Sequence, residues 1–245
     1  MTLAPTIHEI EYPESDGQPM GETDLHRNWM NRLFDLLSHR CRGQHVYVGC
    51  DLLVYYEEGD PARNIVPDVF VVLDCEPGDR RVFKIWEEGK CPDVVFEVTS
   101  RSTRRQDTGF KPRVYAGIGI PEYFVYDPTS DYLFPPLKGF RLTGDAFEAI
   151  EPDASGALEC RELGLRLRLE AGRLVIYDGL TAQLLLTEAE AERQAREAAE
   201  ARAAAEARSR QAAEVRALAE ATARQAAEQE VQRLRELLQR QTPSP

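Results

Sequence analysis

The chain has 245 residues, a hydrophobic content of 42% and a net charge of −12. Its length suits one good-sized domain with an extension. It contains no apolar run of about 18 residues and no charged-then-apolar amino terminus, so we expect neither a membrane span nor a signal peptide, and a cytoplasmic protein. A chain this acidic does not bind nucleic acid through its overall field, so such a role requires a local basic patch.

The cysteines are few, odd in number and widely spaced, with no CxxC pair. This pattern argues against a zinc site and against a disulfide framework. We interpret them as reduced thiols that mainly fill space. They are Cys41, Cys50, Cys75, Cys91 and Cys160.

The first predicted element is a helix that follows a Pro/Gly-rich lead-in at residues 12–23. Thr23 or Asp24 can cap it, and it runs to about Arg42 with apolar side chains on one face. Two strand patterns come next, at residues 45–57 and at Ile65–Asp74. A turn-rich loop separates them, which predicts a hairpin.

The rest of the domain alternates strands with one helix. We predict a short strand at 80–86, a strand at 92–99, a helix at 104–117, a strand at 121–128, and two or three short peripheral strands within 140–180. Residues 1–186 thus form one α/β (α+β) domain, with a mixed central sheet flanked by helices.

Composition changes sharply near Thr187. From there to Gln241 the chain is nearly all Ala, Glu, Arg and Gln, without Gly or Pro, which predicts one long helix. The segment holds 11 acids and 10 arginines, so the domain before it carries almost all the net charge. Residues 242–245 are predicted to be a disordered tail.

The end of this helix has heptad apolar spacing, at Ala227, Val231, Leu234 and Leu238. Elsewhere in the helix, the heptad positions are occupied by alanine or arginine. The pattern is compatible with a coiled coil that joins two chains, and equally with a solvated single helix.

Two acids lie on strands that are otherwise apolar. Glu97 stands within VVFEV, and Asp68 lies near the start of the strand at Ile65–Asp74. Burying a polar group without a hydrogen bond costs on the order of 2–7 kcal/mol, and burying an unpaired carboxylate costs more. Each acid therefore needs a partner or a functional role. Two carboxylates on neighbouring strands could bind a divalent metal, although Asp68 after Pro67 could also be a turn residue.

Metal-dependent phosphodiester cleavage also needs a group that positions or activates water, usually a lysine. Thr99 stands two residues after Glu97 on the same strand face, where a lysine would serve. The next lysine is Lys111, with Asp107 one helical turn before it. Because Pro112 follows, we expect Lys111 at a helix start or a kink. The four histidines do not cluster with the acids in the sequence, and we assign them no role.

Several of these motifs together resemble the Uma family of putative restriction endonucleases, within the PD-(D/E)XK nuclease superfamily. The resemblance covers roughly residues 10 to 180. It rests on PDVFVV with Asp68, PDVVFEVTSRSTRRQD with Glu97, then Lys111 and Tyr115, GIPEYFVYDP, and the openings YPESDGQPMGETDLHRNWM and LLVYYEEGDPARNIVPD.

The resemblance implies a restriction-endonuclease-like core with a metal site where two central strands splay apart. It implies Asp68 and Glu97 as metal ligands, with Mg²⁺ as the metal and Mn²⁺ as an alternative, and a lysine moved from the strand to the next helix, here Lys111. An acid from the first helix region completes such sites, and Glu22 matches best by position, ahead of Glu14. Asp107 is a further catalytic candidate, while Tyr115 is predicted to be a core residue.

Basic residues are dense only after Glu97 within the predicted domain. Arg101, Arg104 and Arg105 lead this stretch, which Lys111 and Arg113 complete. They could contact phosphates beside the metal, or pair with nearby acids.

The sequence therefore predicts a Mg²⁺-dependent endonuclease that acts on DNA, as a homodimer because a duplex offers two strands. The alternative is a catalytically inactive nuclease-like protein that binds nucleic acid or acts as a scaffold, assembling through its C-terminal helix.

Overall fold

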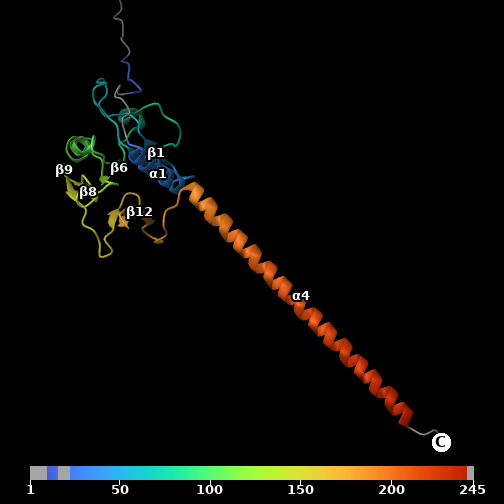
Figure 1. Cartoon of the computed structure of the whole chain (residues 1–245). Helices are drawn as coiled ribbons and strands as arrows, with labels where there is room; N and C mark the ends of the chain where they lie inside the picture. The colour runs from blue at the N-terminus through green and yellow to red at the C-terminus, as the bar shows by residue number, and fades with distance from the viewer. Residues whose placement is uncertain (1–9, 16–22, 242–245) are drawn as a thin grey trace, which may run out of the picture. The chain divides into compact units, whose positions relative to one another are not determined.

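The computed structural model describes residues 10–15 and 23–241, with side chains described to residue 235. The chain divides into two compact units, with the boundary after Glu188. The first unit is a mixed α/β domain and the second is a long helix (Figure 1). The predicted fold class is confirmed: a mixed sheet, helices packed on it, and a long C-terminal helix.

A six-stranded mixed sheet forms the centre of the first unit, in the order β1-β4-β6-β7-β8-β9. Its one parallel pair is β6 with β7, and the other neighbours are antiparallel. The strands are β1 (Val46–Cys50), β4 (Val69–Leu73), β6 (Val94–Val98), β7 (Glu122–Tyr126), β8 (Leu137–Thr143) and β9 (Ala146–Ala149).

Two three-stranded sheets accompany it. One has the order β3-β2-β5 and the other β10-β11-β12. Their strands are β2 (Val54–Tyr55), β3 (Asn64–Ile65), β5 (Phe83–Lys84), β10 (Leu158–Cys160), β11 (Leu165–Glu170) and β12 (Arg173–Asp178).

The predicted hairpin is present but broken. The strand expected at 45–57 divides into β1 and β2 at residues 51–53, where Asp51 has a positive φ of 48°. The prediction of short peripheral strands within 140–180 holds for β11 and β12, which lie in a separate sheet, but it was wrong for the first part, because β8 begins at Leu137 and β8 and β9 extend the central sheet. The GFRLTGDAF stretch is a hairpin whose outer positions are only partly buried, which gave it the polar pattern of a peripheral segment.

Helix α1 (Asp24–Arg40) covers one face of the sheet. The side chain of Thr23 caps it by accepting a hydrogen bond from the His26 N–H at 3.3 Å. Its apolar side chains pack with alternate residues of the strands, among them Val69, Val71 and Phe96. Trp29, Met30, Leu33, Leu36 and Leu37 form the buried stripe of the helix.

The opposite face carries the π-helical turn η1 (Gln106–Phe110) and helix α3 (Lys111–Ile118). There Tyr115 packs with the alternate strand residues Phe70, Val72 and Val95. The short helix α2 (Ile85–Glu88) follows β5. Because strand side chains alternate between faces, residues that share parity with Phe70 and Val95 point toward α3.

One close approach fixes the packing beneath this face. Gly49 of β1 pairs with Phe70 of β4, and a Cβ at Gly49 would lie 2.3 Å from the Phe70 ring. Glycine is thus required at position 49 for the ring to lie across the neighbouring strand. Phe70 in turn makes T-shaped contacts with Tyr47 and Phe83. The Tyr47 and Phe83 rings stack on each other.

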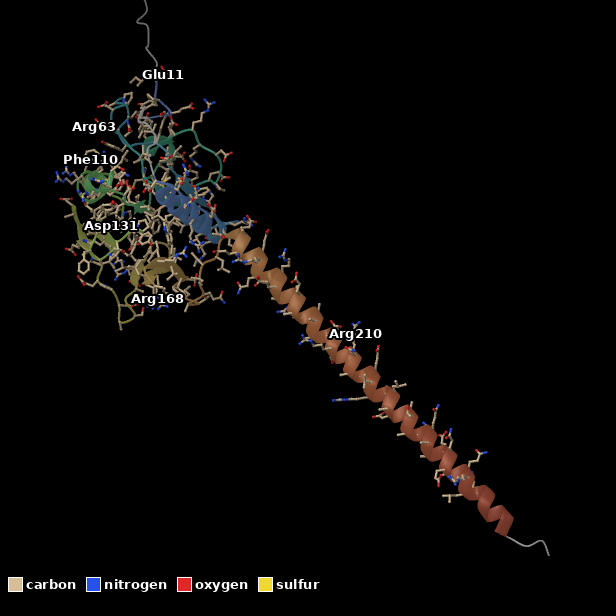
Figure 2. The ribbon with its side chains drawn as sticks, viewed as in Figure 1. Glu11, Arg63, Phe110, Asp131, Arg168 and Arg210 are labelled. Carbon is tan, nitrogen blue, oxygen red and sulfur yellow. The ribbon has the colours of Figure 1, made fainter. Side chains whose placement is uncertain are left out.

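Helix α4 (Glu188–Gln241) is continuous, as predicted (Figure 1). Its described side chains beyond the first turns are exposed, and Figure 2 shows them projecting all around the helix. Glu206 and Arg210 form an i,i+4 ion pair on its surface, at 2.5 Å. Val231 and Leu234 are 49% and 51% exposed, so no described residue of this chain covers these two heptad positions.

None of the five cysteines forms a disulfide bond. Among the described residues, no helix has the length and apolar character needed to cross a membrane.

Candidate functional site

The two strand carboxylates converge on the α3 face of the sheet. Antiparallel pairing places Val69 of β4 opposite Phe96 of β6, so Asp68 and Glu97 are neighbours across the strands. The Asp68 backbone N–H lies 3.4 Å from Glu97 Oε2. Both residues are buried, with exposures of 8% and 1%. Hydrophobic strands thus hold two carboxylates together where water is scarce.

The turn before α3 brings in a lysine. Lys111 is the first residue of α3, directly after the π-helical turn, in agreement with its expected place at a helix start. Its Nζ donates to Glu97 Oε2 at 2.7 Å and lies 3.5 Å from Asp107 Oδ1. Lys111 is only 8% exposed, so it faces the acids rather than solvent. Single π turns of this kind are frequent at functional sites.

Asp68 is held on one side of its carboxylate. Its Oδ2 accepts the Val98 N–H at 2.6 Å and lies 3.1 Å from His26 Nε2. Burial alone would raise the pKa of Asp68, but the Lys111 ammonium, the His26 hydrogen bond and the Val98 N–H outweigh it and lower the pKa below its ordinary value. Oδ1 takes no hydrogen bond from any residue in the described part of the chain and remains available to a ligand.

Glu97 is engaged at both oxygens. Lys111 binds Oε2, and the Tyr115 hydroxyl donates a short hydrogen bond to Oε1. Burial raises the pKa of Glu97 well above its ordinary value; Lys111 offsets part of that rise, and the Asp68 and Asp107 carboxylates add to it. Burial and the contact with Glu97 also raise the pKa of Tyr115, which keeps its hydroxyl a donor.

Asp107 adds a third carboxylate. It is 1% exposed, and neither of its oxygens makes a hydrogen bond of ordinary geometry within the described residues, although Lys111 lies nearby. The Thr99 hydroxyl is also buried without such a bond. Burial raises the pKa of Asp107, and Lys111, Thr103 and Thr99 counteract the rise in part. The Tyr123 hydroxyl donates to the Asp107 carbonyl and fixes the turn.

Lys111 is the single cation that faces all three acids within the described site. Burial alone would lower the pKa of Lys111, but Glu97, Asp68 and Asp107 together raise it. The lysine is therefore an ammonium at neutral pH. When all three carboxyl groups are ionised, one ammonium leaves the group with excess negative charge, which a divalent cation would offset and so favour the ionised forms.

These residues fit a divalent cation that prefers oxygen ligands. Among the described residues, no three His, Cys, Asp or Glu side chains are arranged to enclose a metal ion. Mg²⁺ does not need such an enclosure, since it is usually held by one or two carboxylates together with water and substrate phosphates. Asp68 and Glu97 would hold it, and Asp68 Oδ1 and the two Asp107 oxygens are hard donors of the right kind.

The remaining candidates lie apart from this cluster. Glu22 lies outside the described residues, and Glu14 is paired with Arg81 at 2.8 Å on the surface. Arg101, Arg104 and Arg105 are exposed in the segment that joins β6 to η1. None of the three forms an ion pair with a residue in the described ranges, so pairing with local acids does not occur there.

Sequence reasoning missed two contributors. The expectation that no histidine clusters with the acids was wrong, because His26 is 1% exposed and bonded to Asp68. Tyr115 packs in the core, as predicted, but its hydroxyl also binds Glu97. His26 lies 42 positions before Asp68, and only its place among apolar residues on the inner face of α1 could have indicated burial.

No curated protein gives a significant match. A crystal structure of a putative nuclease belonging to DUF820, from Anabaena variabilis ATCC 29413, is similar at 17% identity and a TM-score of 0.41. The match covers 58% of this chain and 77% of that one. The family model for Uma2, described as putative restriction endonuclease, matches residues 2–170, more than half of the chain, and the protein therefore belongs to this family.

Proposed function

We propose that this protein is a divalent-metal-dependent endonuclease that hydrolyses phosphodiester bonds in DNA, with Mg²⁺ as the metal and Mn²⁺ as a substitute. The observation that carries the proposal is the convergence of Asp68, Glu97 and Lys111 in one buried cluster. Family membership supports it, since the family is described as putative restriction endonuclease. The predicted cytoplasmic location stays a prediction.

The chain's own residues would divide the work. Asp68 and Glu97 hold the cation, which supplies Lewis acidity to the scissile phosphate and the attacking water when it is bound. Val98 N–H and His26 fix Asp68 from one side, so that Oδ1 stays free for the cation. Tyr115 fixes Glu97 from the other side. The carboxylates are thus oriented before any ligand arrives, which lowers the cost of organising the site.

Lys111 would act as an ammonium. Held by the acids, it can orient the attacking water and stabilise negative charge that builds up on the phosphate oxygens. Asp107 Oδ1 lies 3.5 Å from the Lys111 ammonium, and neither Asp107 oxygen has a hydrogen-bond partner among the described residues. Asp107 can therefore accept a hydrogen bond from that water. The two residues lie one helical turn apart, and the intervening π turn sets their spacing.

Cleavage of supercoiled plasmid tests the proposed function. The full-length protein should convert the plasmid to nicked or linear product with Mg²⁺ or Mn²⁺, and EDTA should stop the reaction. Absence of cleavage of plasmid and single-stranded DNA with every divalent metal, together with tight DNA binding, would instead support the inactive nucleic-acid-binding alternative.

The exposed arginines support contact with phosphate. Replacing Arg101, Arg104 and Arg105 by alanine should weaken DNA binding and reduce the slope of log K against log salt by about 2–3, because each phosphate contact contributes roughly 0.7–0.9 to that slope. Binding measured across a salt series checks this. Arg81→Ala/Arg161→Ala, at exposed arginines elsewhere, serves as the control, and an unchanged slope in the triple variant would refute the contact.

We further propose a homodimer that forms through the end of α4. Val231 and Leu234 are half-exposed at heptad spacing, and a second copy would cover them. Val231→Glu/Leu234→Glu should halve the mass measured by sedimentation equilibrium. Leu218→Glu is the matched control, since Leu218 is exposed on α4 but outside the heptad positions. An unchanged mass in the double variant excludes this interface.

A further inference from the structure

The loop that follows β7 leaves the sheet beside the candidate site. Strands β6 and β7 are parallel, with Val98 paired to Tyr126, and the Thr99 N–H donates to the Tyr126 carbonyl at 2.8 Å. The segment after β6 carries the exposed arginines, and the segment after β7 is the loop 127–136. Both segments leave the sheet at the carboxyl ends of these two strands, which lie side by side because the strands are parallel.

One contact links the two segments directly. The guanidinium of Arg104 lies over the ring of Tyr132, 5.6 Å from its centroid. A cation over an aromatic face attracts at this distance. Figure 2 labels Asp131 in this loop and Phe110 in the turn before Lys111. The arginines proposed to contact phosphate are therefore adjacent to an aromatic loop.

A buried carboxylate makes this loop rigid. Asp127 is fully buried and its Oδ2 accepts the Tyr132 and Leu133 N–H groups at 2.6 and 3.0 Å. Its Oδ1 accepts the N–H and hydroxyl of Thr129 at 3.0 and 2.7 Å. Leu133 is buried at 6% exposure. The backbone on the amino side of position 134 is thus fixed by four hydrogen bonds and an apolar anchor.

Phe134, next to that anchor, is 92% exposed. No packing within the described residues accounts for a phenylalanine at this position, because its ring is almost wholly in solvent. A rigidly mounted, exposed aromatic ring in a loop that an arginine contacts is a combination that can bind single-stranded nucleic acid: bases stack on the ring while arginines hold the phosphates.

We propose that Phe134, together with Tyr132 of the same loop and the Arg104 guanidinium that lies over Tyr132, forms a stacking subsite for an unpaired nucleobase. The substrate class would then be single-stranded DNA, or duplex that is locally unwound at the site. This inference deepens the proposed nuclease function and rests on it. A base paired within a duplex cannot offer its face to the ring, so the subsite selects strands whose bases are unstacked.

Binding with and without bases tests the subsite. The full-length protein is kept in EDTA, so that no cleavage occurs, and is titrated into two fluorescent strands of about 12 residues. One strand is oligothymidine; the other has the same phosphates but abasic sugars throughout. The wild type should bind oligothymidine about 5- to 150-fold more tightly, the range expected for one stacked base. Phe134→Ala should remove this preference, while Phe134→Trp should keep it.

Controls distinguish stacking from other roles. Leu180→Ala removes an equally exposed apolar side chain, at 95% exposure, and should leave both affinities unchanged. Phe134→Ala should also leave binding of a blunt duplex unchanged. Equal wild-type affinity for the two strands, weak binding of both, or a preference that survives Phe134→Ala would each overturn the subsite.

Two further results distinguish the stacking subsite from a protein contact and from the proposed nuclease function. Loss of a dimer in Phe134→Ala by sedimentation, with the oligothymidine preference intact, would assign the ring to a protein contact and overturn the subsite. Because binding is measured without metal, the absence of plasmid cleavage would defeat the proposed catalysis and leave the stacking result standing. Cleavage of plasmid without any preference for oligothymidine would support the proposed catalysis and overturn the stacking subsite.

Discussion

Glu97→Gln should lower the rate of metal-dependent plasmid cleavage by about a hundred- to a thousand-fold or more while the protein remains folded. The amide has the shape of the carboxylate but lacks the charge that holds a cation. Its oxygen can still accept the Lys111 hydrogen bond, and its NH₂ can donate to the Tyr115 hydroxyl, so the buried contacts persist. The rate of nicking and the thermal unfolding midpoint should be measured on the same sample.

The chain offers a matched control in Glu122→Gln. Glu122 is a fully buried glutamate on the neighbouring strand β7, but it binds Arg141 at 2.7 Å and accepts the Arg161 N–H at 3.1 Å. Its substitution should reduce stability and leave cleavage intact at temperatures where the protein is folded. Cleavage by Glu97→Gln at the wild-type rate would rule out Glu97 as a metal ligand.

Lys111→Met should cost both activity and stability. We expect cleavage to fall by about 10²- to 10⁴-fold, because the ammonium that stabilises the phosphate charge is gone. The free energy of unfolding should fall by about 3–5 kcal/mol at neutral pH, since buried carboxylates lose their cation. Urea denaturation in EDTA and the nicking assay measure the two effects.

The stability deficit of Lys111→Met should depend on pH with a defined sign. The pKa of Glu97 is raised in the folded protein, chiefly by burial, and removing Lys111 removes the group that offsets this. A carboxyl with a raised folded pKa destabilises the folded state as pH rises through that pKa. The deficit should therefore grow toward alkaline pH and shrink toward acid pH.

Arg161→Met is the control for this substitution. Arg161 is an exposed arginine outside the candidate site whose side chain pairs with Glu159 at 3.0 Å, so its loss should change neither cleavage nor the pH dependence of stability. Full activity and stability in Lys111→Met would mean that another residue supplies the catalytic cation.

The sequence predicted the acids of the candidate site better than their surroundings. Glu97 interrupts an apolar strand, and such a residue is visible without any structure because its burial needs compensation. The spacing to Asp68 was enough to predict neighbouring strands, and the register of β4 with β6 agrees. The lysine was less predictable, since its position depends on a π-helical turn that no local pattern indicates.

Other parts of the fold depend on contacts between distant segments. The His26 hydrogen bond to Asp68 joins α1 to the start of β4, and periodicity shows only that His26 is on the inner face. Strand β8 has buried residues only in its first half, and the edge strand β9 has none, so their polar pattern concealed their place in the central sheet. Residue types alone do not specify either arrangement.

Binding of Mn²⁺ tests the central claim, that Asp68 and Glu97 together hold a divalent cation. Titration calorimetry of the full-length protein should show a single site per chain. Asp68→Asn and Glu97→Gln should each weaken it at least about tenfold, whereas Glu122→Gln should not, because ligating carboxylates supply charge that the amides lack. Equal Mn²⁺ affinity in the wild type and in both site variants would contradict the proposed metal centre.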